Sequence, residues 1–346
     1  DECSWVYVTC TDGVVTAINA DEKGLKGSIP VEFRELSTLN KLSLLLNKIN
    51  GTIGEQIATM SNLTDLTVAA NELTEVQFDK LPSGIVHILV SQNELTGFDT
   101  TQLKRLESLE TLRMVQNELT TPLKDIILQL PESIKDFRFS SNKIGGTIPT
   151  EIGNLVNLEL LEGESTRVAG RLPAEIGSLS KVTSMNLRGN SLTGPIPPEI
   201  GDMHELQHLR LFTNQFNETV PAELANLTRL ESIHIRDNRL SGRIPTEMGL
   251  LSNTLIAMDF SQNAFTGSIP SELGQLTLLN QLSLYFNDLE GVVPTELAEL
   301  VNVGLLYLAS TFITEVPAAM CNAPQFVKIT VPQGALCPCP SCEFAR

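Results

Sequence analysis

The stretch LQHLRLFTNQF at residues 206–216 decides the fold, because it returns as LESIHIRDNRL at 230–240 and as LNQLSLYFNDL at 279–289. All three fit the frame LxxLxLxxNxL, where x is any residue. With Lys23, Thr166 and Thr311 placed in the Asn slot, thirteen slots result, spaced 22 to 25 residues apart. The chain is therefore one unit copied many times. The Asn itself stands at ten of the slots: Asn47, Asn71, Asn93, Asn117, Asn142, Asn190, Asn214, Asn238, Asn263 and Asn287.

Each repeat predicts a short strand followed by a loop. Apolar residues such as Leu209 and Leu211 alternate with polar ones, which is the pattern of a strand with one buried face. Such units stack on their neighbours, so the 346 residues are expected to form one elongated domain. Strands stacked at roughly 4.8 Å make an inner sheet about 60 Å long. That length favours an extended or macromolecular partner.

The repeated Asn is expected to be structural. A buried side-chain amide can bond loop backbone groups that no strand ladder satisfies, and leaving such groups unpaired would be costly. We therefore look for function elsewhere in the frame.

After the Asn, most repeats continue with Gly, a variable residue, a branched residue and Pro. This pattern resembles the plant-type leucine-rich repeat LxGxIPxEIGxLxxLxxLxLxxN of receptor-kinase ectodomains and polygalacturonase-inhibiting proteins. The resemblance implies an α/β solenoid, a leucine-rich repeat horseshoe or superhelix of about thirteen repeats with a parallel concave β-sheet. Repeats between residues 51 and 142 depart from it, so curvature or twist there is expected to differ. The motif stands at 27–30, 146–149, 170–173, 194–197, 242–245, 267–270 and 291–294.

The cysteines lie only at the two ends, where disulfides are expected to staple the caps that cover the terminal apolar layers. This divides the chain into an N-terminal cap (1–14), the repeats (15–318) and a Cys-rich C-terminal cap (319–346). The segment CSWVYVTC resembles the plant-type cap CxWxGVxC. The resemblance implies a Cys3–Cys10 disulfide with Trp5 packed over the first layer, and Tyr7 stands where the family has Gly.

Cys321, Cys337, Cys339 and Cys342 allow three connectivities, among which the sequence does not choose. A metal knuckle is the alternative, but paired cysteines in an extracellular chain favour disulfides, so no metal and no cofactor are expected. This end looks more like the Cys-rich ends of secreted diatom and other algal leucine-rich repeat proteins.

Secretion is also indicated by the Asn-x-Thr acceptors Asn50, Asn62, Asn217 and Asn226, all placed off the inner sheet. No signal peptide is present at Asp1 and no apolar run approaches the ~20 residues of a membrane span. The chain is expected to be a secreted protein or an ectodomain in the extracellular space or cell wall, with membrane attachment only through an anchor outside it.

The net charge of −17 argues against a nucleic-acid partner, because phosphate neutralisation needs Lys and Arg. Much of the acidity is a repeat feature: a Glu two residues after the Pro, where its carboxylate would face the free N–H groups of a helical turn. Weak cation binding along this outer row is possible, but a structural role is the simpler interpretation. The row is Glu32, Glu151, Glu175, Glu199, Glu223, Glu247, Glu272 and Glu296.

The variable positions of the strand frame predict which side chains lie on the inner face. Early repeats place small or apolar residues there, whereas later repeats place charged and aromatic ones. Arg188, Arg210 and Arg236 are close enough in register to converge on one anion, and aromatic residues would add stacking area. The predicted ligand-binding residues are Arg138, Glu162, Arg188, His208, Arg210, Phe212, His234, Arg236, Asp259, Tyr285, Phe286 and Tyr307.

The competing interpretation is that Glu162, Glu164, Asp237 and Asp259 pair with the arginines as a solvated ladder. Recognition is favoured, because exposed ion pairs contribute little and the aromatics need another reason. The resemblance to plant receptors implies peptide binding on this face.

His204, Glu205 and His208 spell HExxH, a zinc-protease signature that works only on a helix. The repeat frame places His208 on a strand and His204 on the preceding turn, so the match is expected to be accidental. An acid–base site of His208 and His234 would lack a water-excluding pocket on an open sheet. We therefore predict no catalytic residue and no enzyme.

Three functions follow. The first is an extracellular recognition module that binds a peptide, protein or acidic glycan on the concave face of the later repeats. The second, from the resemblance to polygalacturonase inhibitors, is an inhibitor of a wall-degrading hydrolase. The third is a structural or adhesive matrix protein. Neither the native partner nor the oligomeric state can be read from the sequence.

Overall fold

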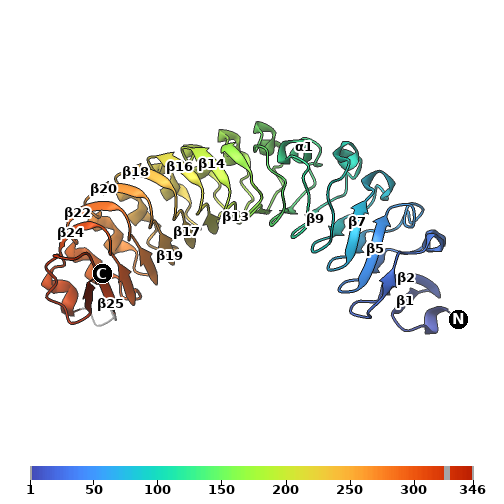
Figure 1. The fold of residues 1–346 in the computed structure, drawn as a ribbon, viewed down its shortest axis with the longest axis horizontal. Helices are drawn as coiled ribbons and strands as arrows, with labels where there is room; N and C mark the ends of the chain where they lie inside the picture. The colour runs from blue at the N-terminus through green and yellow to red at the C-terminus, as the bar shows by residue number, and fades with distance from the viewer. Residues whose placement is uncertain (1, 323–327, 345–346) are drawn as a thin grey trace. The chain divides into compact units, whose positions relative to one another are not determined.

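The computed structural model describes residues 2–322 and 328–344. Its backbone divides into two compact units, Asp1–Val168 and Ala169–Arg346, called here the first and second unit (Figure 1). Within each unit, parallel strands one repeat apart form a sheet, and short helices occupy the opposite face. No described helix is long and apolar enough to cross a membrane.

The first unit begins with an antiparallel pair and continues as a parallel sheet. Its inner strands are β1 (Val8–Thr11), β2 (Val14–Asn19), β4 (Lys41–Ser43), β6 (Asp65–Thr67), β8 (His87–Leu89), β9 (Thr111–Arg113), β10 (Asp136–Arg138) and β11 (Leu160–Glu162). A second row holds β3 (Lys26–Gly27), β5 (Lys48–Ile53) and β7 (Glu72–Val76). The helical segments are η1 (Glu2–Ser4), η2 (Val31–Glu35), η3 (Phe78–Lys80), η4 (Thr100–Arg105), α1 (Leu123–Ile127) and η5 (Thr150–Asn154).

The second unit repeats one arrangement with little variation. Its inner strands, all parallel, are β13 (Ser184–Asn186), β15 (His208–Arg210), β17 (Ser232–His234), β19 (Ala257–Asp259), β21 (Gln281–Ser283), β23 (Leu305–Tyr307), β25 (Lys328–Val331) and β26 (Cys342–Phe344). The second row is β12 (Ala169–Arg171), β14 (Ser191–Gly194), β16 (Gln215–Glu218), β18 (Arg239–Gly242), β20 (Ala264–Gly267), β22 (Asp288–Val292) and β24 (Phe312–Glu315). The helical segments are η6 (Ala174–Ser178), η7 (Pro198–Asp202), η8 (Ala222–Asn226), η9 (Thr246–Leu251), η10 (Ser271–Gln275), η11 (Thr295–Glu299) and η12 (Ala318–Asn322).

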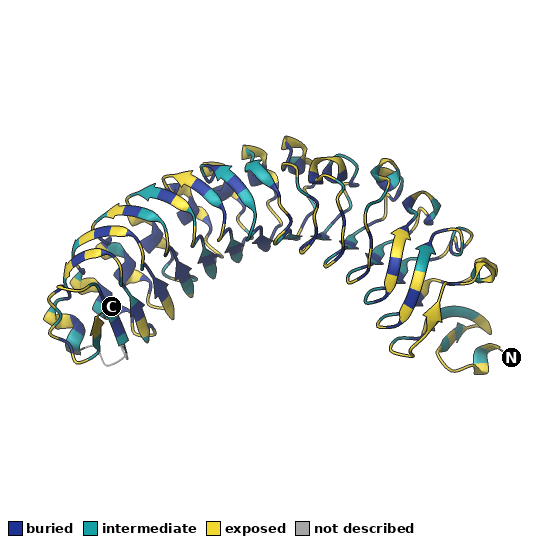
Figure 2. Ribbon diagram, in the orientation of Figure 1, coloured by how far each residue is buried: buried dark blue, intermediate teal, exposed yellow. Residues whose placement is uncertain are grey.

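The core lies between the inner strands and the helical segments. Leu209 and Leu211 from the strand side and Leu224 from the helix side are fully buried. Figure 2 shows the same alternation of buried and exposed residues along the second-row strands. Neighbouring helical segments approach so closely that a Cβ at Gly177 would lie 2.3 Å from the carbonyl oxygen of Glu199. Gly177, in the segment Glu-Ile-Gly that follows the Pro, is therefore required by packing at this repeat.

The Asn residues have the structural role predicted for them. The amide nitrogen of Asn214 donates to the carbonyl oxygens of Leu187 and Leu211, at 2.9 and 3.0 Å, and its oxygen accepts from the N–H of Leu192 at 3.0 Å. Each Asn thus joins two repeats. The residue before it adopts a left-handed conformation, as in Thr213 (φ 56°), which turns the chain out of the strand.

The second row of strands is interrupted in the first unit. Between residues 77 and 168 the structure has no second-row strand, and α1 stands where most other described repeats have a 3₁₀ helix. A missing Pro does not account for this, because α1 and η5 begin directly after Pro122 and Pro149, just as η7 and η8 follow Pro197 and Pro221. The sequence predicted a different curvature or twist for residues 51–142; the interruption of the second row overlaps that stretch only in part, and the curvature stays a prediction.

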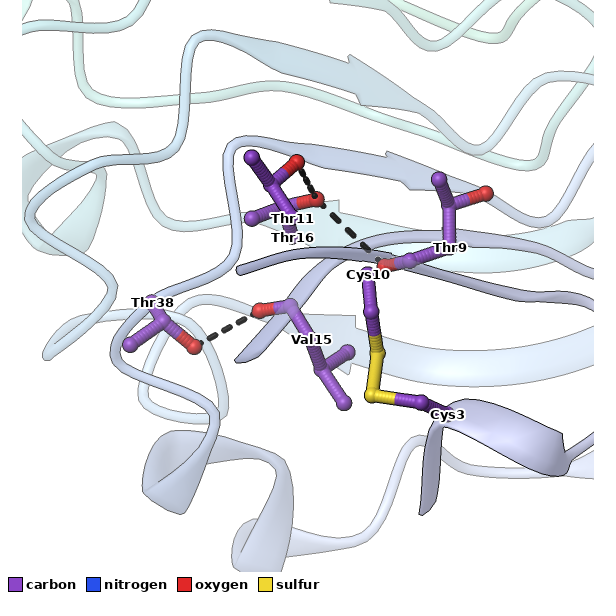
Figure 3. Close-up of a disulfide and its surroundings, with 7 residues drawn as sticks. All are labelled: Cys3, Thr9, Cys10, Thr11, Val15, Thr16 and Thr38. Carbon is purple, nitrogen blue, oxygen red and sulfur yellow. Dashed lines mark hydrogen bonds between the residues drawn. A yellow bond between two sulfur atoms is a disulfide. The ribbon is translucent and has the colours of Figure 1, made fainter. Parts of the chain in front are cut away.

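The N-terminal cap contains the Cys3–Cys10 disulfide that the family resemblance implied (Figure 3). Hydrogen bonds from Thr16 Oγ1 to the carbonyl of Thr9, and from Thr38 Oγ1 to that of Val15, tie β2 to its neighbours. The expectation for Trp5 is wrong: its side chain is 63% exposed and does not cover the first layer. Trp5 directly follows the short helix η1, which carries it outward.

At the C-terminal end the structure selects one of the three connectivities, Cys321–Cys339 and Cys337–Cys342. The sulfur atoms of Cys337, Cys339 and Cys342 lie within 4.8 Å of one another, the arrangement that suggested a metal knuckle, but all three are used in disulfides. The acceptors Asn50, Asn62, Asn217 and Asn226 are all exposed, and none is on an inner strand.

Candidate functional site

The inner face of the second unit carries its charged and aromatic side chains in rows, because the strands pair in register one repeat apart. His208 stands beside Ser232 in the row of first strand residues. Arg210, His234 and Asp259 follow one another in the row of third residues. A further row, two residues beyond each strand, contains Arg188, Phe212 and Arg236. We call Arg188, His208, Arg210, Phe212, His234 and Arg236 the arginine cluster.

Phe212 is the centre of this cluster. The guanidinium carbons of Arg188 and Arg236 lie 5.2 and 5.5 Å from the centroid of its ring, both within cation–π range. The ring of His234 meets it edge-on at 6.4 Å between centroids. Two of the three arginines predicted to converge, Arg188 and Arg236, therefore share one aromatic ring, and both are half-buried; their convergence with Arg210 on an anion stays a prediction.

The carboxylates of Asp237 and Asp259 are not paired with Arg210 or Arg236 in the part of the chain that the structure describes. Within the described residues, neither Arg210 nor Arg236 forms an ion pair, and Asp237 is exposed. Asp259 is 8% exposed, but it accepts hydrogen bonds from the hydroxyl and the N–H of Ser261, at 2.5 and 3.2 Å. The solvated ladder expected by the competing interpretation is therefore not formed by Arg210 and Arg236.

The two histidines of the cluster have different surroundings. His208 Nδ1 lies 3.0 Å from the hydroxyl of Ser232. Burial lowers the pKa of His234 below its ordinary value; the carboxylate of Asp259 opposes this, while the charges of Arg210, Arg236 and His208 lower it further. His234 therefore favours the neutral imidazole, and an anion placed among these groups would favour its protonation.

The other predicted aromatics lie two repeats further on. The rings of Tyr285 and Phe286 meet edge-on at 5.6 Å, and those of Tyr285 and Tyr307 at 6.3 Å. These three rings form an aromatic group separate from the arginine cluster. Strand β19, which carries Asp259, lies between the strand of His234 and strand β21, which precedes Tyr285.

Arg138 and Glu162 belong to the first unit, where they are part of an ion-pair network. Arg138 Nε lies 2.7 Å from one oxygen of Asp136, and Arg113 Nη2 lies 2.7 Å from the other. Arg138 Nη1 reaches Glu162 at 3.4 Å, and hydrogen bonding to Asp136 raises the pKa of Arg138 above its ordinary value. Arg113 and Asp136 were not among the predicted site residues. The sequence does contain a pattern that points to Asp136: it stands two residues before Arg138 on one strand, so the two side chains share a face.

The HExxH match is accidental, as the repeat frame predicted. His208 begins strand β15, while His204 is exposed on the turn after η7. The two histidines share no helix, so the geometry of the zinc-protease signature is absent.

Comparison with known proteins gives one family and a consistent set of structures. The family described as "Leucine-rich repeat region" matches residues 137–248. Receptor-like kinase TMK4 of Arabidopsis thaliana is 38% identical over 77 residues, which are 22% of this chain and 8% of that protein. The plant peptide hormone receptor RGFR1, solved in complex with RGF2, superposes with a TM-score of 0.84 at 28% identity. A TDR receptor superposes with 0.83 at 26% identity.

Each of the two structural matches covers 95% of this chain, but this chain spans only 55% and 56% of those receptors. The matches therefore establish the leucine-rich repeat fold and its likeness to plant receptor ectodomains.

Proposed function

We propose that this chain, a leucine-rich repeat protein of the plant type, is an extracellular, non-catalytic recognition module that binds an acidic peptide or protein segment at the arginine cluster of its second unit. The structural neighbours support a peptide, since RGFR1 is a peptide hormone receptor solved with RGF2.

One observation carries the proposal: Arg210 and Arg236 stand half-buried on the inner face without an ion pair among the described residues. The charges of Arg210 and Arg236 both disfavour a charged His234, a Coulomb cost that Asp259 opposes without forming an ion pair with either arginine among the described residues. A ligand carboxylate would remove that cost and accept charge-assisted, bidentate hydrogen bonds. Phe212 keeps Arg188 and Arg236 oriented by stacking, so less side-chain entropy is lost on binding.

The geometry favours an extended ligand. The side chains of the cluster come from successive strands, which pair in register one repeat apart. A chain lying across these strands would meet a new set of side chains roughly every 4.8 Å, which is about one and a half residues of an extended peptide at its rise of roughly 3.3 Å per residue. Catalysis is not proposed: the hydroxyl of Ser232 lies 3.0 Å from His208 Nδ1, but both groups stand on a sheet face, where a reacting group would not be shielded from water.

The test is binding of the disulfide-intact protein to an array of acidic peptides and acidic oligosaccharides. The triple variant Arg188→Ala, Arg210→Ala, Arg236→Ala is compared with a charge-matched control, Arg229→Ala, Arg239→Ala, Arg243→Ala, taken from outside the cluster in the same unit. We expect the first variant to bind its peptide about 100-fold more weakly or worse, and the control to bind within a fewfold of the parent protein.

Two results would overturn the proposal: no acidic peptide bound by the parent protein, or an equal loss in both variants, which would indicate attraction by net charge alone. Binding to the oligosaccharides only would keep the site and replace the ligand class.

A further inference from the structure

A second surface of the second unit has a different chemistry from the arginine cluster. An open cavity of about 450 Å³ lies where three repeats leave their inner strands, lined by Gln262, Asn263, Phe286, Asn287, Asp288 and Ser310. Its polar groups come from repeats on both sides of Phe286, because Gln262, Phe286 and Ser310 occupy the same position of successive repeats.

Two of the lining amides are already used by the fold. The amide nitrogen of Asn287 donates to the carbonyls of Phe260 and Leu284, and its oxygen accepts from the N–H of Phe265. Asn263 is committed in the same way. The side chains of Gln262, Asp288 and Ser310, in contrast, are exposed and form no hydrogen bond within the described residues. The cavity thus offers one amide, one carboxylate and one hydroxyl to a ligand.

Phe286 is unusual for its place in the repeat. The left-handed residue before the Asn is polar in the neighbouring repeats, as in Thr213, Asp237, Gln262 and Ser310. Phe286 has the same conformation (φ 51°), and its side chain is 55% exposed. The edge-on contact with Tyr285 holds its ring in place. A large aromatic side chain presented to solvent at a position that is polar in the adjoining repeats is a candidate contact surface.

Charge narrows the choice of ligand. Between Arg243 and Lys328 the sequence has no Lys, Arg or His, while Asp288 and Glu290 are exposed beside the cavity. An acidic ligand would meet repulsion here, in contrast to the arginine cluster. A peptide side chain would find one ring but no second apolar wall to enclose it.

A pyranose ring has complementary chemistry. Its C–H face is apolar and electropositive, which suits the negative face of an aromatic ring. When the sugar stacks on Phe286, its equatorial hydroxyls would point outward past the edge of the phenyl ring. There the carboxylate of Asp288 can accept from two neighbouring hydroxyls, and the Gln262 amide and Ser310 hydroxyl can both donate and accept.

We propose that the cavity at Gln262, Phe286, Asp288 and Ser310 is a subsite for a pyranose residue of a neutral glycan. Phe286 is the stacking platform, and Asp288 is the main acceptor for sugar hydroxyls. The subsite does not depend on the peptide proposed above, because it shares no residue with the arginine cluster.

The experiment is saturation-transfer NMR of the parent protein with cellohexaose, laminarihexaose, xylohexaose and mannohexaose, followed by titration of whichever binds. The main variant is Phe286→Ser, which installs the residue that the next repeat already carries at Ser310. Its matched control is Leu46→Ser in the first unit, at the same repeat position, with φ 56° and 51% exposure.

We expect binding of at least one hexasaccharide, roughly tenfold weaker in Phe286→Ser and weaker in Asp288→Asn. Binding should be unchanged in Leu46→Ser and in the triple arginine variant, and retained in Phe286→Tyr. The proposal is overturned if no hexasaccharide receives saturation, or if Phe286→Ser binds as tightly as the parent. Because the arginine variant is scored separately, failure of the glycan subsite leaves the peptide proposal standing, and the reverse also holds.

Discussion

The two units place arginines at equivalent positions of their inner strands and treat them in opposite ways. On β10 of the first unit, Arg138 is joined to Asp136, which also holds Arg113 from β9. On β15 of the second unit, the residue corresponding to Asp136 is His208, and Arg210 forms no ion pair among the described residues. The two sites also differ on the next strand, where Glu162 stands beside Arg138 and His234 beside Arg210, so the neighbours of each arginine separate an arginine paired within the fold from one that a ligand could reach.

The largest effect that we expect is on the free energy of unfolding when the ion pairs of the first unit are removed. Asp136 is 8% exposed, so Asp136→Ala would leave Arg113 and Arg138 without their shared acceptor. We expect a loss of about 2 kcal/mol in the free energy of unfolding, measured by urea denaturation. Arg210→Ala, which breaks no described ion pair, should change it by less than about 0.5 kcal/mol. Equal losses in the two variants would show that Arg210 is also part of the fold.

Copying the first unit's arrangement into the second should weaken ligand binding. His208→Asp places a carboxylate two residues before Arg210 on the same strand, as Asp136 stands before Arg138. An internal ion pair would then compete with the ligand, and we expect roughly tenfold weaker binding of an acidic peptide. His208→Asn, similar in shape but uncharged, is the control. Equal affinities of His208→Asp and His208→Asn in a titration would contradict the idea that a carboxylate at this position competes with the ligand.

The smallest effect expected is on pH dependence. Burial, Arg210 and Arg236 lower the pKa of His234, and a bound carboxylate would raise it again, so binding should take up protons. Affinity should therefore rise about two- to threefold as pH falls from 7 to 5, where a ligand carboxylate is still ionised. His234→Gln should flatten this dependence in calorimetric titrations, and a pH profile unchanged by that substitution would contradict the assignment.

The stability of the unliganded protein should change in the opposite sense. Because the unfolded chain protonates His234 at a higher pH than the folded chain does, the contribution of this residue to stability falls as pH drops below about 6.5. A pH series of urea denaturation curves on the parent protein and His234→Gln separates this effect from ligand binding.

Most of the backbone could be predicted from the repeat frame. The period placed His208 on a strand, dismissed the HExxH match and assigned the Asn residues a structural role, because a residue's place in a short repeat fixes its place in the stacked unit. The same argument failed for Trp5, which stands outside the repeats at an end where no neighbouring layer constrains it. It also missed Arg113 and Asp136, whose importance comes from contact across two repeats.

By itself, the sequence determined the leucine-rich repeat fold, the rows of side chains along the inner strands and the gathering of cysteines at the two ends. These features are local and periodic, so they can be counted. The pairing of the four terminal cysteines was decided only by the tertiary structure, because it depends on the path of the chain after the last repeat.

The tertiary structure also decided which charges are satisfied. Arg138 and Arg210 look alike in the frame, yet only one has a carboxylate within reach. Phe212 became the centre of a cluster because Arg188 and Arg236 approach the same ring, and Phe286 became a candidate platform because its neighbours in space are polar and exposed. Electrostatic and stacking energies depend on distance and orientation between residues of different repeats. The period alone contains no information on those distances.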